Sequence, residues 1–158
     1  MRNEASTDID DNTRSTQWRG MVLLDVLDDD EERFDVSFLE RIDHPVTVCH
    51  GPAPGTVCPL LAERTCEKYQ HAHGIVFELD LDDAQHRAIV AKYRMLNPEI
   101  PIRVVVDSDQ LERYHHLLAG VQAWLRQPSV ADLDGFAAEV EAADRYADST
   151  PEPQSDVE

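Results

Sequence analysis

Acidic side chains follow three of the apolar runs in this sequence, at points where they could bind a cation. Asp25 and Asp28 come at the end of the first run, Glu78 and Asp80 end the third, and Asp107 follows the fourth. Hard cations such as Mg²⁺ take oxygen ligands of this kind. Whether these carboxylates meet depends on the elements that carry them, because only one edge of a parallel sheet collects the ends of its strands.

The cysteines form a second candidate site. Cys49 and His50 follow the second apolar run, and Cys58 and Cys66 come nine and eight residues further along in turn. Thiolate and imidazole groups suit zinc, although structural zinc sites usually pair cysteines at closer spacing. One hypothesis is therefore a thiol- or metal-responsive module built on these four residues. The other is that the three cysteines are small buried residues that only pack in the core.

If the thiol hypothesis is right, we expect Cys49 and Cys58 to approach across the loop between them. Their Cα atoms should then lie within about 7 Å, the limit for a disulfide without movement of the backbone. Pro59 suits the first position of a helix, so Cys58 is expected at a helix N-terminus. That position would lower the pKa of its thiol and make it the most reactive of the three.

Five apolar runs alternate with segments of helical periodicity. The runs predict strands over 20–27, 46–49, 74–81, 102–106 and 121–125. The segments between and after them predict five helices, beginning near residues 28, 58, 82, 109 and 129. Such alternation predicts a single doubly wound (βα)5 domain of the α/β class, with a five-stranded parallel sheet in the order 2-1-3-4-5.

The last two of these units resemble the end of a bacterial response-regulator receiver domain. In that family a strand that begins with proline leads to a helix ending in Ala-Gly, and a short strand ends in Lys-Pro before the last helix. The matching pieces here are Pro101–Val106, Ala119–Gly120 and Gln127–Pro128. With the spacing of the other units, the resemblance covers residues of about 20 to 145 and implies a flavodoxin-like fold.

The resemblance also implies roles for the residues at the strand ends. Asp80 matches the phosphoryl acceptor of the family, and Asp25, Asp28 and Asp80 are the candidates for holding Mg²⁺. Glu78, Asp107, Arg126 and Gln127 are expected at the edge of the same pocket. However, Gln127 stands where the family has its lysine, and an amide cannot supply a positive charge to an acyl phosphate.

Two interpretations follow for the phosphorylation chemistry. Val106 stands where the family has a hydroxyl group, and Ser108 comes two residues late. We therefore interpret the chain as a degenerate, non-enzymatic receiver-like domain of a signalling system that acts by protein–protein contact. The resemblance places that contact on the fourth and fifth helices and the strand between them. An active phosphoryl acceptor at Asp80 is the other interpretation.

The resemblance makes one prediction about the backbone. Receiver-like proteins often have a cis peptide bond before the proline that precedes the last helix. Only about 5–6% of X–Pro bonds in folded proteins are cis, so composition alone favours the trans form. On the strength of the resemblance we predict a cis bond between Gln127 and Pro128.

Composition limits the classes of partner. The chain has 158 residues, a net charge of −18 and only two lysines. This charge argues against nucleic acid and against an anionic membrane surface, which both attract cationic proteins. We expect a cytoplasmic protein with an unidentified protein partner, a second copy of the chain included. The polar composition of residues 1–19 and 147–158 predicts a disordered leader and tail around a domain spanning 20–146.

Overall fold

The computed structural model describes residues 20–27, 29–53 and 55–149, with only the backbone described for 29–33 and 144–149. The leader expected over residues 1–19 lies outside these ranges, and so do Asp28 and the tail from residue 150 onward. The last helix includes residues 147–149, which the sequence analysis assigned to the tail.

The domain is built on a five-stranded parallel sheet with the strand order β2-β1-β3-β4-β5. This confirms the predicted fold class and topology. The strands are β1 (Val22–Val26), β2 (Val46–Cys49), β3 (Gly74–Glu78), β4 (Ile102–Val105) and β5 (Gln122–Trp124). Because every strand runs the same way, all five carboxyl ends lie at one edge of the sheet.

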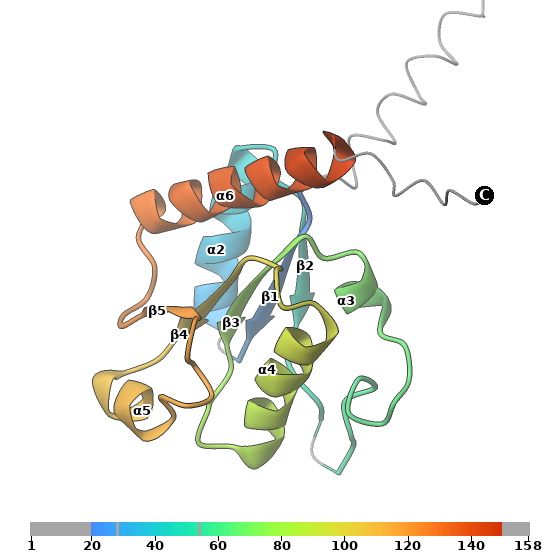
Figure 1. Ribbon diagram of the computed structural model, residues 1–158. Helices are drawn as coiled ribbons and strands as arrows, with labels where there is room; N and C mark the ends of the chain where they lie inside the picture. Colours follow the sequence, from blue (N-terminus) through green and yellow to red (C-terminus); the bar gives the residue numbers. More distant parts are fainter. Residues whose placement is uncertain (1–19, 28, 54, 150–158) are drawn as a thin grey trace, which may run out of the picture.

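Helices cover both faces of the sheet, as Figure 1 shows. They are α2 (Asp29–Arg41), α3 (Glu67–Gln70), α4 (Ala84–Leu96), α5 (Ser108–Arg113) and α6 (Val130–Ser149). α2 and α6 lie together on one face, whereas α3 and α4 lie on the other. No helix within the described ranges is long and apolar enough to cross a membrane.

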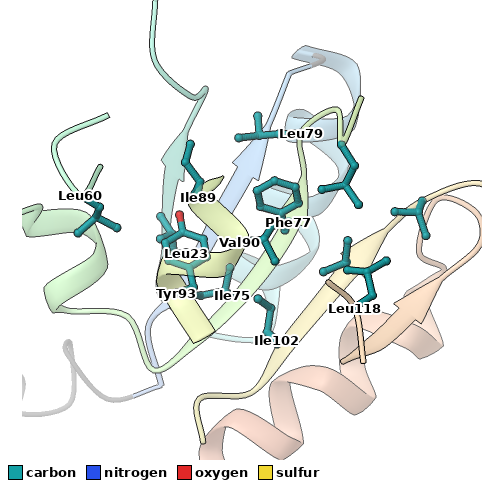
Figure 2. Packing of buried hydrophobic residues seen from close by; sticks show 13 residues of the cluster. Leu23, Leu60, Ile75, Phe77, Leu79, Ile89, Val90, Tyr93, Ile102 and Leu118 are labelled. Atoms are coloured by element: carbon teal, nitrogen blue, oxygen red, sulfur yellow. The ribbon is translucent and has the colours of Figure 1, made fainter. Parts of the chain in front are cut away.

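The alternation of side chains along β1 divides the core in two. Val22, Leu24 and Val26 pack toward α2 and α6, together with Phe136 of α6. Leu23 belongs to a second cluster with Phe77, Val90 and Tyr93, which fills the space between the sheet and α4 (Figure 2). Successive residues of a strand point to opposite faces, so a central strand that is covered on both sides must be apolar throughout.

Local sequence explains how α4 begins. The Asp83 carboxylate accepts hydrogen bonds from the backbone N–H groups of Gln85, at 2.8 Å, and His86, at 3.4 Å. This is N-capping, and it confirms the predicted start at Asp82–Asp83. The helix ends at Leu96, and Asn97 is its C-cap just before Pro98.

Between β2 and β3 the prediction was wrong. A helix was expected from Cys58 to Tyr69, but residues 50–53 and 55–66 are irregular, apart from a tight turn at 59–63, and α3 has only four residues. The turn ends at Glu63, whose φ of 60° is left-handed and cannot continue an α-helix. The apolar residues whose spacing suggested one helix lie partly in this turn and partly in α3. The described residues of the segment 50–66 therefore form no helix.

The fourth predicted helix was too long. The structure ends α5 at Arg113, and residues 114–120 continue as turns up to Gly120, whose φ is 82°. Gly120 ends this segment, as expected, but the segment that it ends is a series of turns and not a helix.

Candidate functional site

The carboxyl edge of the sheet carries Asp80 just beyond β3. The register pairs Val26 of β1 with Glu78 of β3, so these two strands end level with each other. Leu79 then turns inward and is buried, and Asp80 is exposed. The exposed position makes Asp80 accessible at the edge where ligands of this fold bind.

The carboxylate of Asp80 already has hydrogen-bond partners. Its Oδ1 atom accepts from the backbone N–H of Asp82 at 2.9 Å and from Nε2 of Gln110 at 3.1 Å. Gln110 also belongs to the N-terminus of α5, where its Oε1 accepts from the N–H of Asp107 and its own N–H donates to Oδ1 of Asp107. This reciprocal arrangement is a capping box. One side chain therefore joins Asp80 to the first turn of α5.

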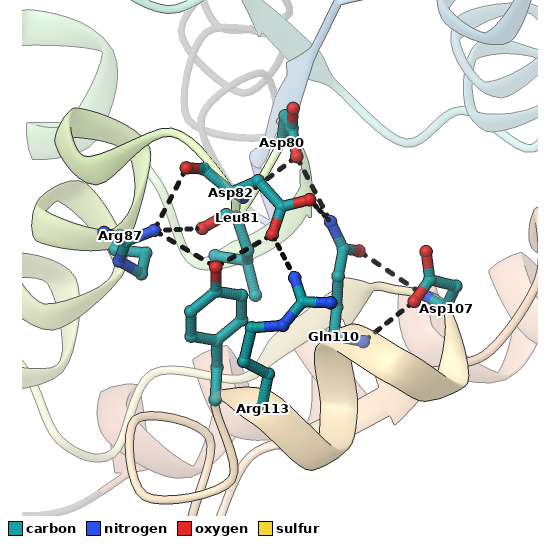
Figure 3. A network of polar contacts seen from close by, with 8 residues as sticks. Asp80, Leu81, Asp82, Arg87, Asp107, Gln110 and Arg113 are labelled. Atoms are coloured by element: carbon teal, nitrogen blue, oxygen red, sulfur yellow. Dashed lines mark hydrogen bonds and ion pairs between the residues drawn. The ribbon is translucent and has the colours of Figure 1, made fainter.

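Asp82 lies at the centre of a wider set of contacts (Figure 3). Its Oδ1 accepts from Nη1 of Arg113 at 2.6 Å and from the hydroxyl of Tyr114 at 2.8 Å. The hydrogen bond from Tyr114, with further contributions from Gln110 and Arg113, lowers the pKa of Asp82. Arg87 of α4 donates to the carbonyl of Leu81 and to the Tyr114 hydroxyl. We call Asp80, Asp82, Arg87, Asp107, Gln110, Arg113 and Tyr114 the Asp80 network.

Gln127 takes part in a different contact. Its Nε2 donates to Oε1 of Glu78 at 2.9 Å. Glu78 is buried and interacts with the buried carboxyl of Asp35 in α2. Burial raises the pKa of Asp35, which favours its protonated form. The amide at position 127 therefore interacts with this acidic pair.

The peptide bond between Gln127 and Pro128 is trans, so the predicted cis bond is wrong. The chain turns between β5 and α6 through bends at residues 125–127, and no isomerised bond is needed. The ordinary preference for trans prevails here over the resemblance.

The other residues expected at the pocket edge have separate partners. Arg126 forms an ion pair with Asp132 in α6 at 3.0 Å. Val106, at the position of the hydroxyl group, is buried. Ser108 is the first residue of α5 and is exposed.

Asp25 lies one residue before the end of β1, but it is only 1% exposed. Its Oδ2 accepts from the hydroxyl of Tyr93 in α4 at 2.6 Å. Burial raises the pKa of Asp25 to about 7, against the opposing effects of hydrogen bonds from Tyr93 and Cys49. Asp25 is thus buried and bonded to Tyr93, whereas Asp80 is exposed and bonded to Gln110, and the magnesium role expected of the two together stays a prediction.

The structure brings the three cysteines to the wall of one cavity. This cavity of about 140 Å³ lies between β1, α4 and the segment 50–66. Asp25, Cys49, Cys58, Cys66, Lys68 and Tyr93 line it, together with apolar side chains. We call it the Asp25 cavity. His50 instead contacts the carbonyl of Val26 through Nδ1, at 3.0 Å.

All three cysteines are free thiols and half-buried. Burial raises the pKa of the Cys49 thiol. The helix whose N-terminus was expected to activate Cys58 does not form, so that prediction loses its physical basis. In the part of the chain that the structure describes, no three His, Cys, Asp or Glu side chains are placed to hold a metal ion together. The close approach of Cys49 and Cys58 stays a prediction.

Some of these contacts were missed by the sequence analysis. The pattern Asp-x-x-Gln at 107–110 is a capping-box signal and could have identified Gln110 as a residue fixed at a helix start. Its contact with Asp80, 30 residues away in sequence, has no local signal. The same is true of the Tyr93 hydroxyl on Asp25, which is 68 residues away.

No protein-family model matches the chain, and no curated protein sequence matches it. Solved structures do match. A structure described as adenylate cyclase from Rhodopirellula baltica has a TM-score of 0.60 at 13% identity, over 83% of this chain and 93% of the other. A CheY-like receiver domain from Methanospirillum hungatei has a TM-score of 0.55 at 15% identity, over 80% and 97%.

A third match is the receiver domain of sensor histidine kinase PA1611 from Pseudomonas aeruginosa, with magnesium coordinated in its active-site cleft. Its TM-score is 0.56 at 15% identity, over 77% of this chain and 97% of the other. The chain has the receiver-domain fold. At these identities the likeness concerns the receiver fold alone.

Proposed function

We propose that this chain is a receiver-like signalling domain that acts by contact with another protein and does not use aspartyl phosphorylation. The observation that carries the proposal is the hydrogen bond from Gln127 to Glu78 at the position where receiver domains have their lysine. A neutral amide that is already hydrogen-bonded to a buried acid cannot neutralise the charge of a phosphoryl group on Asp80.

Two further features support the loss of phosphorylation. Val106 offers no hydroxyl group at the end of β4, and Asp80 is engaged by Gln110 and by the Asp82 N–H. A phosphoryl group on Oδ1 of Asp80 would have to displace Gln110, whose side chain also forms the capping box of α5. The missing hydroxyl group removes a contact that would stabilise the acyl phosphate. The hydrogen bonds on Asp80 compete with its formation.

A direct phosphorylation assay tests this proposal. Incubation with acetyl phosphate and Mg²⁺ is expected to leave the intact mass of the protein unchanged. The control is Asp80→Asn, which removes the candidate acceptor. A gain of one phosphoryl group by the unaltered chain that is absent in Asp80→Asn would contradict the proposal. A gain that appears only in the double variant Val106→Thr, Gln127→Lys would trace the loss to these two positions.

The contact surface is proposed on α5, β5 and α6, in line with the resemblance. Large apolar side chains are exposed at the junction of β5 and α6, where Leu125 is 55% and Val130 is 53% exposed. Exposed apolar groups of this kind commonly form the centre of protein interfaces.

Cross-linking in the native cell extract, followed by mass spectrometry, tests this surface. Leu125→Asp is expected to reduce the yield of cross-linked partner at least about tenfold, because a charge in an interface must be desolvated. Met95→Asp is the matched control, since Met95 is an exposed apolar residue of α4, a helix on the opposite face of the sheet from α6. Equal loss in both variants, or loss in Met95→Asp alone, would place the contact elsewhere.

A further inference from the structure

We propose that the Asp25 cavity binds a small, uncharged ligand: a compact ring of the size of phenol with one hydroxyl group that donates a hydrogen bond to Asp25. This goes beyond the signalling role proposed above and does not depend on it. Neither the Asp80 network nor the β5–α6 surface contributes to the cavity.

The size and lining of the cavity determine the apolar part of the ligand. A volume of about 140 Å³ matches a single six-membered ring, since a protein cavity of roughly 150 Å³ is known to hold benzene. Leu23, Leu60, Leu79 and Ile89 supply much of the wall. An apolar ring displaces water that such walls cannot hydrogen-bond.

Asp25 determines the polar part. A carboxyl group offers several lone-pair positions, and the Tyr93 hydroxyl and the Cys49 thiol occupy only part of this capacity. A hydroxyl group of the ligand can therefore still donate to it. A cationic amine is disfavoured, because it would lose its hydration in an apolar cavity where the Lys68 ammonium is also part of the wall.

The cavity has a route to solvent through the segment 50–66. Thr56 and Val57 line it and are themselves exposed. Lys68 is held at the wall by a hydrogen bond of 2.8 Å from its Nζ to the carbonyl of Val48.

Titrations of the full chain with phenol and with benzene, monitored by NMR, test the proposal. Phenol is expected to shift resonances of β1, α4 and residues 49–66 saturably, with a dissociation constant of about 1 mM or lower, which is within reach of seven non-hydrogen atoms. Benzene, which cannot donate, should bind at least about fivefold more weakly. Absence of saturable shifts with phenol, or equal affinity for both probes, would overturn the proposal.

Variants at Cys66 separate the cavity from any other apolar surface. Cys66→Leu fills part of the cavity and should abolish phenol binding, whereas Cys66→Ser keeps its size and should preserve it. Binding of phenol that is unchanged in Cys66→Leu would overturn the proposal.

The thiols provide a second measurement that needs no variant. All three cysteines of the chain line this cavity, so bound phenol should slow the alkylation of each by iodoacetamide. We expect at least a threefold slowing at saturation. Unchanged alkylation rates at a phenol concentration that saturates the NMR shifts would place phenol elsewhere and overturn the proposal.

Discussion

Replacing Asp25 with asparagine is expected to remove a pH dependence from the stability of this domain. The folded pKa of Asp25 is raised from 3.8 to about 7, chiefly by burial, so the folded state binds a proton more tightly than the unfolded state. Stability from this group is therefore fully present below the unfolded pKa, and it is lost as the pH rises through the folded value. The groups facing Asp25 are Tyr93, Cys49 and, further away, Lys68.

The expected magnitude follows from the two pKa values. Between pH 5.5 and pH 8 the free energy of unfolding of the unaltered chain should fall by roughly 2 kcal/mol because of Asp25. Urea denaturation at the two pH values measures this fall. In Asp25→Asn the fall should be smaller by about that amount, whatever the absolute stability of the variant.

Asp35→Asn is the comparison for this experiment. The pKa of Asp35 is also raised by burial, so it contributes a pH dependence of the same sign. The two variants should each remove a separate part of the fall, because the carboxyl groups lie on opposite faces of the sheet. A pH dependence that is as steep in Asp25→Asn as in the unaltered chain would show that Asp25 is ionised at neutral pH in the folded protein.

Phe77→Ala is expected to destabilise the domain by about 3–5 kcal/mol, as measured by urea denaturation. Phe77 lies in the central strand β3, is 0% exposed and packs in the cluster between the sheet and α4 (Figure 2). Truncation removes the transfer energy of the ring and leaves a space that its neighbours in the middle of the sheet cannot fill by moving.

Phe34→Ala makes the same change in chemistry at the surface. Phe34 is 44% exposed on α2, so its loss should cost less than about 1 kcal/mol. Equal effects of the two substitutions would contradict the placement of Phe77 at the centre of the core.

The strands and their order could be predicted because the information is local and repeated. Val46–Cys49 is a strand with the predicted bounds, and Asp83 caps α4 as the sequence indicates. The segment after Cys58 has the right apolar spacing for a helix, but spacing does not show where the backbone turns. The left-handed residue at Glu63 separates the pattern into a turn and a four-residue helix.

The surroundings of the site residues were less predictable than the fold. The exposed position of Asp80 follows from its place after a buried strand. The burial of Asp25 under Tyr93 depends on how α4 crosses β1, which no local pattern encodes. The trans bond at Pro128 shows the limit of a resemblance in fold, since a shared topology does not fix the conformation of one loop.

We expect the irregular segment at 50–53 and 55–66 to control entry to the Asp25 cavity, because Thr56 and Val57 line the cavity and are exposed. Many of its backbone hydrogen bonds are internal, such as those within residues 53–56 and 58–64, and Cys58 N–H with Gln85 links it to α4. Local opening of such a segment costs less free energy than opening of a central strand. Exchange between the Asp25 cavity and solvent is therefore a matter of loop kinetics, and the parallel sheet can remain intact while it occurs.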